Sequence, residues 1–308
     1  MSTLITVHGV YTICPTPFKE DMSVDVASIC RLTDFLISTG VKGLAVLGFL
    51  GELHKLSDQE RQLVAKVFVD HAAGRVPVWV GVRALGIAGA LQQCQEAQAI
   101  GADAVFVAPL DGAGDALLYE YYQTLASSVQ IPVVIHDFPD SFSTEITPEV
   151  IARLSQTGGV NMIKMEEPPV GQKISRIKAL AEPDAVKIFG GLGGVYFLEE
   201  LQRGAIGTMT GFAFPEVLVA IYKQFVAGDH KAAAALFDRY CPLIRYEFQP
   251  KIGLALRKYV YQKRGAIATR VLRSPGMRID DITMNEIDAV VQRVGLSYDG
   301  SGPTILAS

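Results

Sequence analysis

The sequence predicts an α/β protein that folds as a (β/α)8 TIM barrel followed by a C-terminal helical domain. Eight short runs rich in β-branched and apolar residues alternate with longer amphipathic stretches, and eight βα units are the number that closes such a barrel. Several runs, such as 132–137, are almost continuously hydrophobic, as expected for parallel strands buried on both faces. The 308 residues, 49% of them hydrophobic, are enough for a barrel of roughly 250 residues and a smaller addition.

The expected strands are spaced regularly, with helix-like stretches between them. They cover residues 9–14, 43–48, 76–82, 104–108, 132–137, 160–165, 186–190 and 206–210. A doubly wound sheet is the alternative arrangement, and one that binds a dinucleotide would carry a GxGxxG turn after its first strand. Here the first strand leads into Cys14-Pro15-Thr16-Pro17, and the glycine-rich stretch 190–194 follows the seventh strand. These positions favour the barrel.

The alternation of strands and helices ends near residue 228. Beyond it, residues 230–247, 250–264 and 283–294 are expected to form three helices with no strand between them. We therefore expect a barrel domain over residues 1–228 and a C-terminal domain over residues 229–308, with a loose tail at 297–308. Recognisable caps mark three helix starts: Ser57 with Glu60 and Thr283 with Glu286 as capping boxes, and Thr147 before Pro148.

Composition argues against several classes of function. The formal net charge is -4 and no run of Lys and Arg occurs, which argues against nucleic-acid binding. No apolar run approaches the ~20 residues of a membrane span, and no signal peptide is recognisable. Cys14, Cys30, Cys94 and Cys241 are scattered, which indicates free thiols rather than a disulfide framework or a zinc site. We expect a cytoplasmic protein without a metal or other cofactor.

Lys164 is the most distinctive candidate for catalysis. Active sites of such barrels lie at the C-terminal ends of the strands, and Lys164 lies there within the apolar run 161–165. A lysine is almost never fully buried without a partner or a function. Desolvation lowers the pKa of a buried lysine in general, and a neutral amine can attack a carbonyl to form an imine. The structural alternative is an ion pair with Glu166 or Glu167.

Three further candidates lie at strand ends. His136 ends an apolar run and can transfer protons near neutral pH, with a hydrogen-bonded core histidine as the alternative. Glu166 is a rival for this role, because it lies two residues past Lys164 and shares its face of the strand. Arg83 is a candidate clamp for a carboxylate, with a salt bridge at the rim as its alternative.

Two glycine-rich segments follow strands and can bring backbone close to a ligand. Gly48-Phe49-Leu50-Gly51-Glu52 follows the second strand, and successive N–H groups there can cradle a carboxylate. Gly190 opens the second segment, 190–194, which either contacts a substrate or only forms a tight turn.

Nearly the whole chain resembles the dihydrodipicolinate synthase / N-acetylneuraminate lyase family. Segment 48–52 occupies the place of the family's G-[ST]-T-G-E motif, and segment 134–139 the place of its Y-N-x-P motif. Ile163-Lys164 occupies the place of its Schiff-base lysine, and Gly204-Ala205-Ile206-Gly207 looks like the eighth-strand segment that lines the substrate. The resemblance therefore implies substrate contacts at Phe49, Leu50 and Ile206.

The sequence also departs from the family pattern. Phe49 and Leu50 stand in place of hydroxyl residues, and His136 stands in place of the catalytic tyrosine. Ser141 falls where an arginine usually follows the second motif. The tyrosine–threonine–tyrosine proton relay of the synthase is therefore missing, and segment 164–166 looks more like the branch that contains 2-keto-3-deoxy sugar-acid dehydratases.

The resemblance implies a Schiff-base lyase that dehydrates a 2-keto-3-deoxy sugar acid or cleaves it by retro-aldol chemistry. Its catalytic residues would be Lys164, His136 and Glu166, with His136 as the main acid–base group. The alternatives are a pyruvate-dependent aldolase or synthase, and a catalytically silent barrel that binds a keto acid. Family members are commonly tetramers, so we expect a homotetramer built as a dimer of dimers. The expected partner is a small 2-oxo acid, with neither a nucleic acid nor a membrane.

Overall fold

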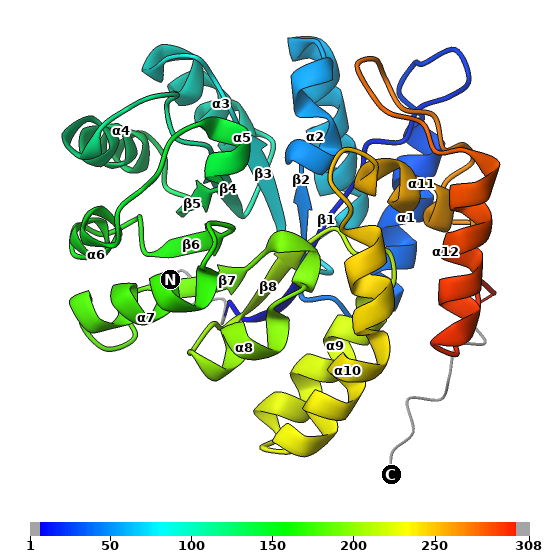
Figure 1. Ribbon diagram of the computed structural model, residues 1–308. Coiled ribbons are helices and arrows are strands. Elements are labelled where there is room, and N and C mark those ends of the chain that lie inside the picture. The colour runs from blue at the N-terminus through cyan, green and yellow to red at the C-terminus, as the bar shows by residue number, and fades with distance from the viewer. Residues whose placement is uncertain (1–6, 300–308) are drawn as a thin grey trace.

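A computed structural model describes residues 7–299 of the chain. Its centre is a closed barrel of eight parallel strands that follow one another in sequence order, with helices around the outside (Figure 1). The predicted (β/α)8 barrel is therefore confirmed. The strands are β1 (Gly9–Ile13), β2 (Gly43–Val46), β3 (Val78–Val82), β4 (Ala104–Val107), β5 (Val133–Asp137), β6 (Met162–Met165), β7 (Lys187–Gly190) and β8 (Gly207–Thr210).

Helices connect the strands and then continue alone to form a C-terminal helical region. The barrel helices are α1 (Val26–Ser38), α2 (Asp58–Ala72), α3 (Ile87–Ala99), α4 (Asp115–Ser128), α5 (Pro139–Phe142), α6 (Pro148–Ser155), α7 (Val170–Leu180), α8 (Phe197–Gln202) and α9 (Pro215–Val226). Short 3-10 turns are η1 (Phe49–Gly51), η2 (Leu53–Lys55) and η3 (Leu192–Gly194). The C-terminal helices are α10 (His230–Glu247), α11 (Gly253–Lys263) and α12 (Asp281–Arg293).

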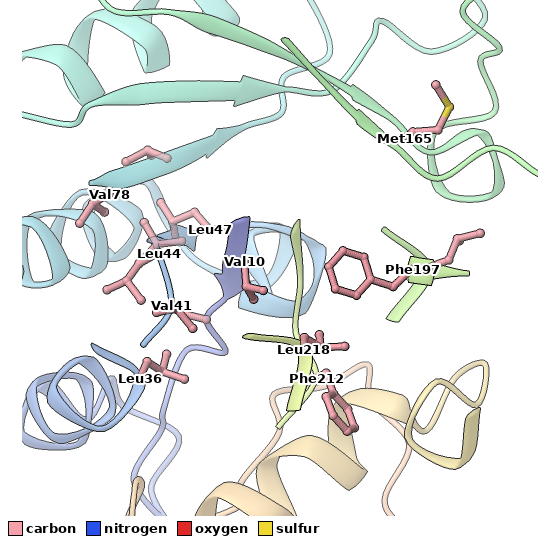
Figure 2. Packing of buried hydrophobic residues seen from close by; sticks show 14 of the residues in the cluster. Val10, Leu36, Val41, Leu44, Leu47, Val78, Met165, Phe197, Phe212 and Leu218 are labelled. Atoms are coloured by element: carbon pink, nitrogen blue, oxygen red, sulfur yellow. The ribbon is translucent and has the colours of Figure 1, made fainter. Parts of the chain in front are cut away.

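Alternate residues of each strand face opposite sides of the barrel wall, which divides the buried residues into two cores. One face fills the barrel interior with side chains such as Tyr11. The other packs against the surrounding helices, and Figure 2 shows part of this larger cluster. Val134 and Met162 belong to the interior cluster. The next residues of the same parity, His136 and Lys164, therefore point into the barrel as well.

Two of the three predicted helix caps are confirmed. Ser57 and Glu60 form a reciprocal capping box at α2, and the Thr147 side chain caps α6. The third is wrong, because α12 begins at Asp281 rather than at residue 283. Asp280 is its N-cap and accepts a hydrogen bond from the Thr283 N–H at 2.8 Å. Thr283 therefore lies within the first turn, and it does not precede the helix.

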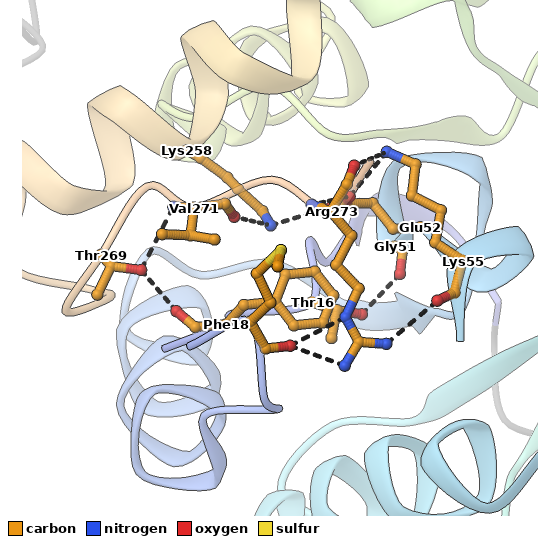
Figure 3. Close-up of polar contacts among 10 residues, drawn as sticks. Thr16, Phe18, Gly51, Glu52, Lys55, Lys258, Thr269, Val271 and Arg273 are labelled. Carbon is orange, nitrogen blue, oxygen red and sulfur yellow. Dashed lines mark hydrogen bonds and ion pairs between the residues drawn. The ribbon is translucent and has the colours of Figure 1, made fainter. Parts of the chain in front are cut away.

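The C-terminal region is tied to the barrel by a network of buried charges (Figure 3). Glu52, in a left-handed conformation after η1, accepts hydrogen bonds from Lys258 Nζ of α11 at 2.6 Å and from Lys55 Nζ at 2.9 Å. The Arg273 N–H donates to the same carboxylate at 3.1 Å. The Arg273 guanidinium reaches back to the Met22 carbonyl at 2.8 Å. These contacts hold α11 and the segment after it against the barrel mouth.

The predicted boundary between two domains, at residues 228 and 229, falls in the turn between α9 and α10 and stays a prediction. Of the predicted tail, residues 300–308 lie outside the described residues. Within residues 7–299, no helix has both the length and the apolar character that crossing a membrane requires.

Candidate active site

A cavity of about 660 Å³ opens at the C-terminal ends of the strands. This volume lies in the range of small-molecule sites, roughly 300–1,000 Å³. Barrel strands and their loops supply one part of the wall, and the turn from α10 to α11, the first turns of α11 and the segment before α12 supply the rest. The wall includes Phe49, Leu50, Lys55, Ser141, Lys164, Glu166, Gly211, Lys251, Gly253 and Arg257.

Lys164 is held at the cavity by its place in the barrel wall. It pairs with His136 of β5 on one side and with Phe189 of β7 on the other. Its parity directs the side chain inward, and only 5% of the residue is exposed. The aliphatic stem is thus packed among interior residues, while the amine reaches the cavity wall.

Three titratable groups meet at the Lys164 amine. Nζ lies 2.5 Å from Glu166 Oε2 and 3.0 Å from His136 Nε2, and these two partners are 3.1 Å apart. The other carboxylate oxygen of Glu166 accepts a hydrogen bond from the Leu192 N–H at 2.9 Å. The ion pair that was the structural alternative for Lys164 is therefore present. It lies on the wall of a cavity, however, where a carbonyl compound can reach the amine.

The electrostatics of this group differ from the sequence-based expectation for His136. Burial lowers the pKa of His136 to about 4, and the positive charge of Lys164 contributes to this. The imidazole is therefore neutral near pH 7 and does not titrate there, although it can accept a proton. Burial alone would raise the pKa of Glu166, but Lys164 and His136 outweigh it and lower the pKa to about 2. Glu166 is an ionised carboxylate.

Glu166 and His136 also differ in their access to the cavity. Glu166 and Lys164 line it, whereas His136 lies beneath them and is not part of the wall among the residues described. The His136 ring packs edge-on against Phe106 at 5.6 Å and Phe142 at 4.9 Å between ring centroids. A ligand in the cavity would thus meet the carboxylate before the imidazole.

Phe49 and Leu50 give one side of the cavity an apolar surface. Phe49 is 39% exposed and stacks on His54 with ring centroids 4.9 Å apart. Leu50 points inward and packs beside the interior cluster, close to the end of β8 at Gly211. The structure brings both residues to the cavity together with Lys164.

Arg83, Gly190 and Ile206 are not among the cavity-lining residues that the structure describes. Arg83 lies 3.8 Å from Asp111. This contact is the rim salt bridge that the sequence offers as the alternative to a carboxylate clamp. Gly190 faces outward from β7, where a Cβ atom would lie 1.7 Å from a carboxylate oxygen of Glu200, so close packing requires glycine. Ile206 precedes β8 at the opposite end of that strand and packs beside the interior cluster.

Several wall residues carry no local sequence signal of function. Lys251, Gly253 and Arg257 come from the turn after α10 and from α11, and reach the mouth only because α11 docks there. Lys55 follows the glycine-rich segment after β2, but nothing in the local sequence distinguishes it from a surface lysine. The hydrophobic pattern of α11 predicts a helix there, but it does not tell which face of the helix meets the cavity.

Glu200 is a buried carboxyl behind the glycine-rich turn. It lies in α8, and neither of its oxygens has an aligned hydrogen-bond partner among the described residues. Burial raises its pKa to about 8, and the nearby Gly191 N–H offsets part of the rise. Since it faces the outer side of β7, it lies outside the cavity. Within residues 7–299, no cluster of three or more His, Cys, Asp and Glu side chains could hold a metal ion.

A parallel barrel with a buried lysine beside a carboxylate at its mouth defines the class of barrel lyases related to class I aldolases. The chain belongs to the Dihydrodipicolinate synthetase family, whose family model matches residues 6–294. The predicted family and lyase class are therefore confirmed.

Relatives within the family carry out different reactions. The L-2-keto-3-deoxyarabonate dehydratase of Azospirillum brasilense is 28% identical over 293 residues, which cover 93% of this chain and 94% of the relative. The "Probable 2-dehydro-3-deoxy-D-pentonate aldolase" of Escherichia coli (strain K12) is 31% identical, covering 82% of this chain and 89% of the relative. The crystal structure of dihydrodipicolinate synthase from Rhodopseudomonas palustris superposes with a TM-score of 0.88 at 36% identity, covering 93% and 97%.

Proposed function

We propose that the protein is a lyase that binds a 2-keto-3-deoxy sugar acid as a Schiff base on Lys164 and removes water from it or cleaves it by retro-aldol chemistry. The observation that carries the proposal is the buried Lys164 amine on the cavity wall, 2.5 Å from Glu166 and 3.0 Å from His136. Relatives named as a 2-keto-3-deoxyarabonate dehydratase and a 2-dehydro-3-deoxy-pentonate aldolase support this class of substrate.

His136 serves imine formation in this scheme. Lys164 must give up a proton before it attacks the C2 carbonyl, and the imidazole, whose Nε2 lies 3.0 Å from Nζ, is placed to hold that proton transiently during the attack. Nζ bonds to C2 as the C2=O π bond opens, and a proton of the attached nitrogen moves to the oxygen, which becomes a hydroxyl. The same imidazole returns the proton to this hydroxyl, which leaves as water. The C2=N iminium is then formed next to Glu166.

Glu166 serves the step at C3 and C4. The iminium withdraws electrons and acidifies the C3 proton, and Glu166 is the ionised carboxylate on the cavity wall that can remove it. The enamine expels the C4 hydroxyl, which takes the proton from Glu166 and leaves as water. Hydrolysis of the imine frees Lys164. In retro-aldol cleavage, Glu166 instead takes the proton of the C4 hydroxyl while the C3–C4 bond breaks.

Phe49 and Leu50 are the substrate-binding residues in this proposal. They line the cavity beside Lys164 and replace polar side chains with an apolar surface. Exclusion of water on this side protects the iminium from early hydrolysis. The roles expected of Arg83, Gly190 and Ile206 stay predictions.

Borohydride trapping and a turnover screen test the function together. With pyruvate and borohydride, wild type should gain the mass of one reduced adduct, and Lys164→Ala should not. A panel of 2-keto-3-deoxy acids is then assayed with semicarbazide for new 2-oxo products, and with lactate dehydrogenase for pyruvate. Pyruvate release indicates cleavage, whereas a new 2-oxo product without pyruvate indicates dehydration. Trapping without turnover on any sugar acid would favour a silent keto-acid-binding barrel.

The two proton roles separate in the same assays. Glu166→Gln should lower kcat by about 10²–10⁴-fold while leaving trapping at Lys164 in place. His136→Ala should instead slow trapping itself. Glu167→Gln is the matched control, because Glu167 pairs with Lys173 and does not line the cavity. If Glu166→Gln keeps near-full turnover and His136→Ala loses most of it, removal of the C3 proton belongs to His136 and not to Glu166.

We also propose a homotetramer in a reducing compartment such as the cytoplasm. Exposed apolar side chains support an assembly, among them Leu85 at 97% and Ile87 at 39% on the loop and helix after β3. The four cysteines are unpaired, as is usual in reducing compartments. Light scattering at micromolar concentration tests the assembly, and a monomer would contradict it.

A further inference from the structure

Arg257 is a buried cation on the wall of the active-site cavity. It lies in α11 and is 5% exposed. Gly253, one turn earlier on the same face of the helix, has no side chain, and a Cβ there would lie 3.2 Å from Arg257 Nη1. The guanidinium thus occupies the space that glycine leaves free. Its Cδ atom lies 3.6 Å from the Cβ position of Gly211, just past β8.

The guanidinium has donors without acceptors. Its one polar contact among the described residues is an ion pair, with Nε 3.2 Å from Glu247 Oε1 but not aligned for a hydrogen bond. Both oxygens of Glu247 already accept from the Ala213 N–H, at 2.9 and 3.2 Å. Neither Nη1 nor Nη2 donates to any residue between 7 and 299. Nε is fully buried without a hydrogen bond, whereas Nη1 and Nη2 are not among the fully buried nitrogens of the described residues and can reach the cavity, where a ligand can supply acceptors.

The other buried cations of the cavity are already engaged. Lys55 Nζ donates to Glu52 at 2.9 Å and to the Arg273 carbonyl at 2.9 Å. Lys164 has Glu166 and His136 as partners. Arg257 is therefore the buried cation of the described wall that is best able to bind an anion.

We propose that Arg257 binds a second carboxylate of the substrate, at the end remote from the imine, and so selects 2-keto-3-deoxy diacids over monoacids. The inference rests on the proposed function, because it concerns the other end of the same substrate. The Nη1 and Nη2 groups present the planar fork that pairs with a carboxylate in two parallel hydrogen bonds. Arg257 packs past the end of β8, and β8 lies two strands from β6, which carries Lys164; two strand spacings are roughly 10 Å. A chain of five or six carbons can reach between the two groups.

Matched ligand pairs test the charge at the far end of the substrate. The acids 2-oxoglutarate and 2-oxovalerate have the same chain length and differ at the far carbon, carboxylate against methyl, as do 2-oxoadipate and 2-oxohexanoate. In isothermal titration calorimetry, wild type should bind each diacid with a lower Kd than its matched monoacid. Arg257→Gln should raise the Kd of the diacids roughly 10- to 100-fold, as expected for losing a charge-assisted pair. The Kd of the monoacids and of pyruvate should stay within about twofold.

Two further variants keep the result interpretable. Lys251→Gln removes an exposed charge at the same cavity and should leave the ratio of diacid to monoacid Kd unchanged. Arg257→Lys keeps the charge without the fork and should give an intermediate ratio, and it carries the test if Arg257→Gln does not fold.

The inference is overturned if wild type does not prefer diacids, if Lys251→Gln abolishes the preference equally, or if Arg257→Gln weakens pyruvate as much as the diacids. Borohydride trapping of pyruvate on wild type is measured in parallel. Failure of trapping would count against the Schiff-base function, while the calorimetric ratio still decides the role of Arg257.

Discussion

Glu200 allows a test of the buried charges that does not depend on catalysis. Burial raises its pKa from 4.5 to about 8, and no aligned hydrogen bond to its oxygens exists among the described residues. In the unfolded chain the same carboxyl would ionise near its ordinary value. Between these two pKa values, the folded protein therefore holds a proton that the unfolded chain has released.

Proton linkage gives the sign and the size of the effect. Because the folded state binds the extra proton, this group makes stability fall as the pH rises, by about 1.4 kcal/mol per pH unit. Its contribution is fully present below pH 4.5 and is lost as the pH rises through about 8. Over that pH window, the contribution of Glu200 to the free energy of unfolding changes by at most roughly 5 kcal/mol. Glu200→Gln keeps the shape without the ionisable proton, so it should gain stability over wild type as the pH rises.

Urea unfolding measures this prediction as a difference in the free energy of unfolding between Glu200→Gln and wild type at several pH values. Asp137 and Glu247, whose pKa values burial raises to about 7, are present in both proteins and cancel in the difference. Glu199→Gln, at the exposed neighbouring position, should follow the wild-type pH dependence. Parallel curves for Glu200→Gln and wild type would mean that Glu200 is ionised in the folded state, and would refute the reasoning.

Two other predictions concern the docking of α11 and the range of substrates. Lys258→Met should cost up to about 3–5 kcal/mol in urea unfolding, the upper end being reached only if the remaining contacts of Glu52 with Lys55 and the Arg273 N–H do not compensate its buried charge. Lys263→Met, which removes an exposed pair with Asp288, should cost less than about 1 kcal/mol, and equal losses would contradict this ranking. Condensation of pyruvate with aspartate semialdehyde should be negligible in a coupled assay, since Ser141 stands on the cavity wall where an arginine is usual; sustained turnover would contradict it.

The barrel and its lysine could be predicted because their signals are local. A strand buried on both faces is apolar at nearly every position, so each run is recognisable without knowing its neighbours. Lys164 interrupts such a run, and the cost of burying an amine makes the interruption conspicuous. Alternation along the strand then places Glu166 on the same side as Lys164, which the 2.5 Å contact bears out.

The rest of the site depends on contacts between distant segments. Nothing around Arg257 indicates that a glycine one turn earlier and the end of β8 leave room for its guanidinium. The sequence alone predicts that His136 titrates near neutral pH, whereas burial lowers its pKa to about 4. Ile206 belongs to an apolar run, but the run does not tell which of its ends faces the mouth. These properties come from the packing around each residue.

The adjacent residues Arg257 and Lys258 connect the stability of the fold to the shape of the site. Neighbours on a helix point about 100° apart, so when Lys258 turns toward Glu52, Arg257 turns toward the cavity. The pair of Lys258 with Glu52 thus fixes the rotation of α11 about its axis as well as its docking. Glu52 belongs to the segment that also supplies Phe49 and Leu50. One glutamate therefore joins the two halves of the cavity wall. Lys258→Met should accordingly displace the Arg257 guanidinium while leaving the strand that carries Lys164 in place.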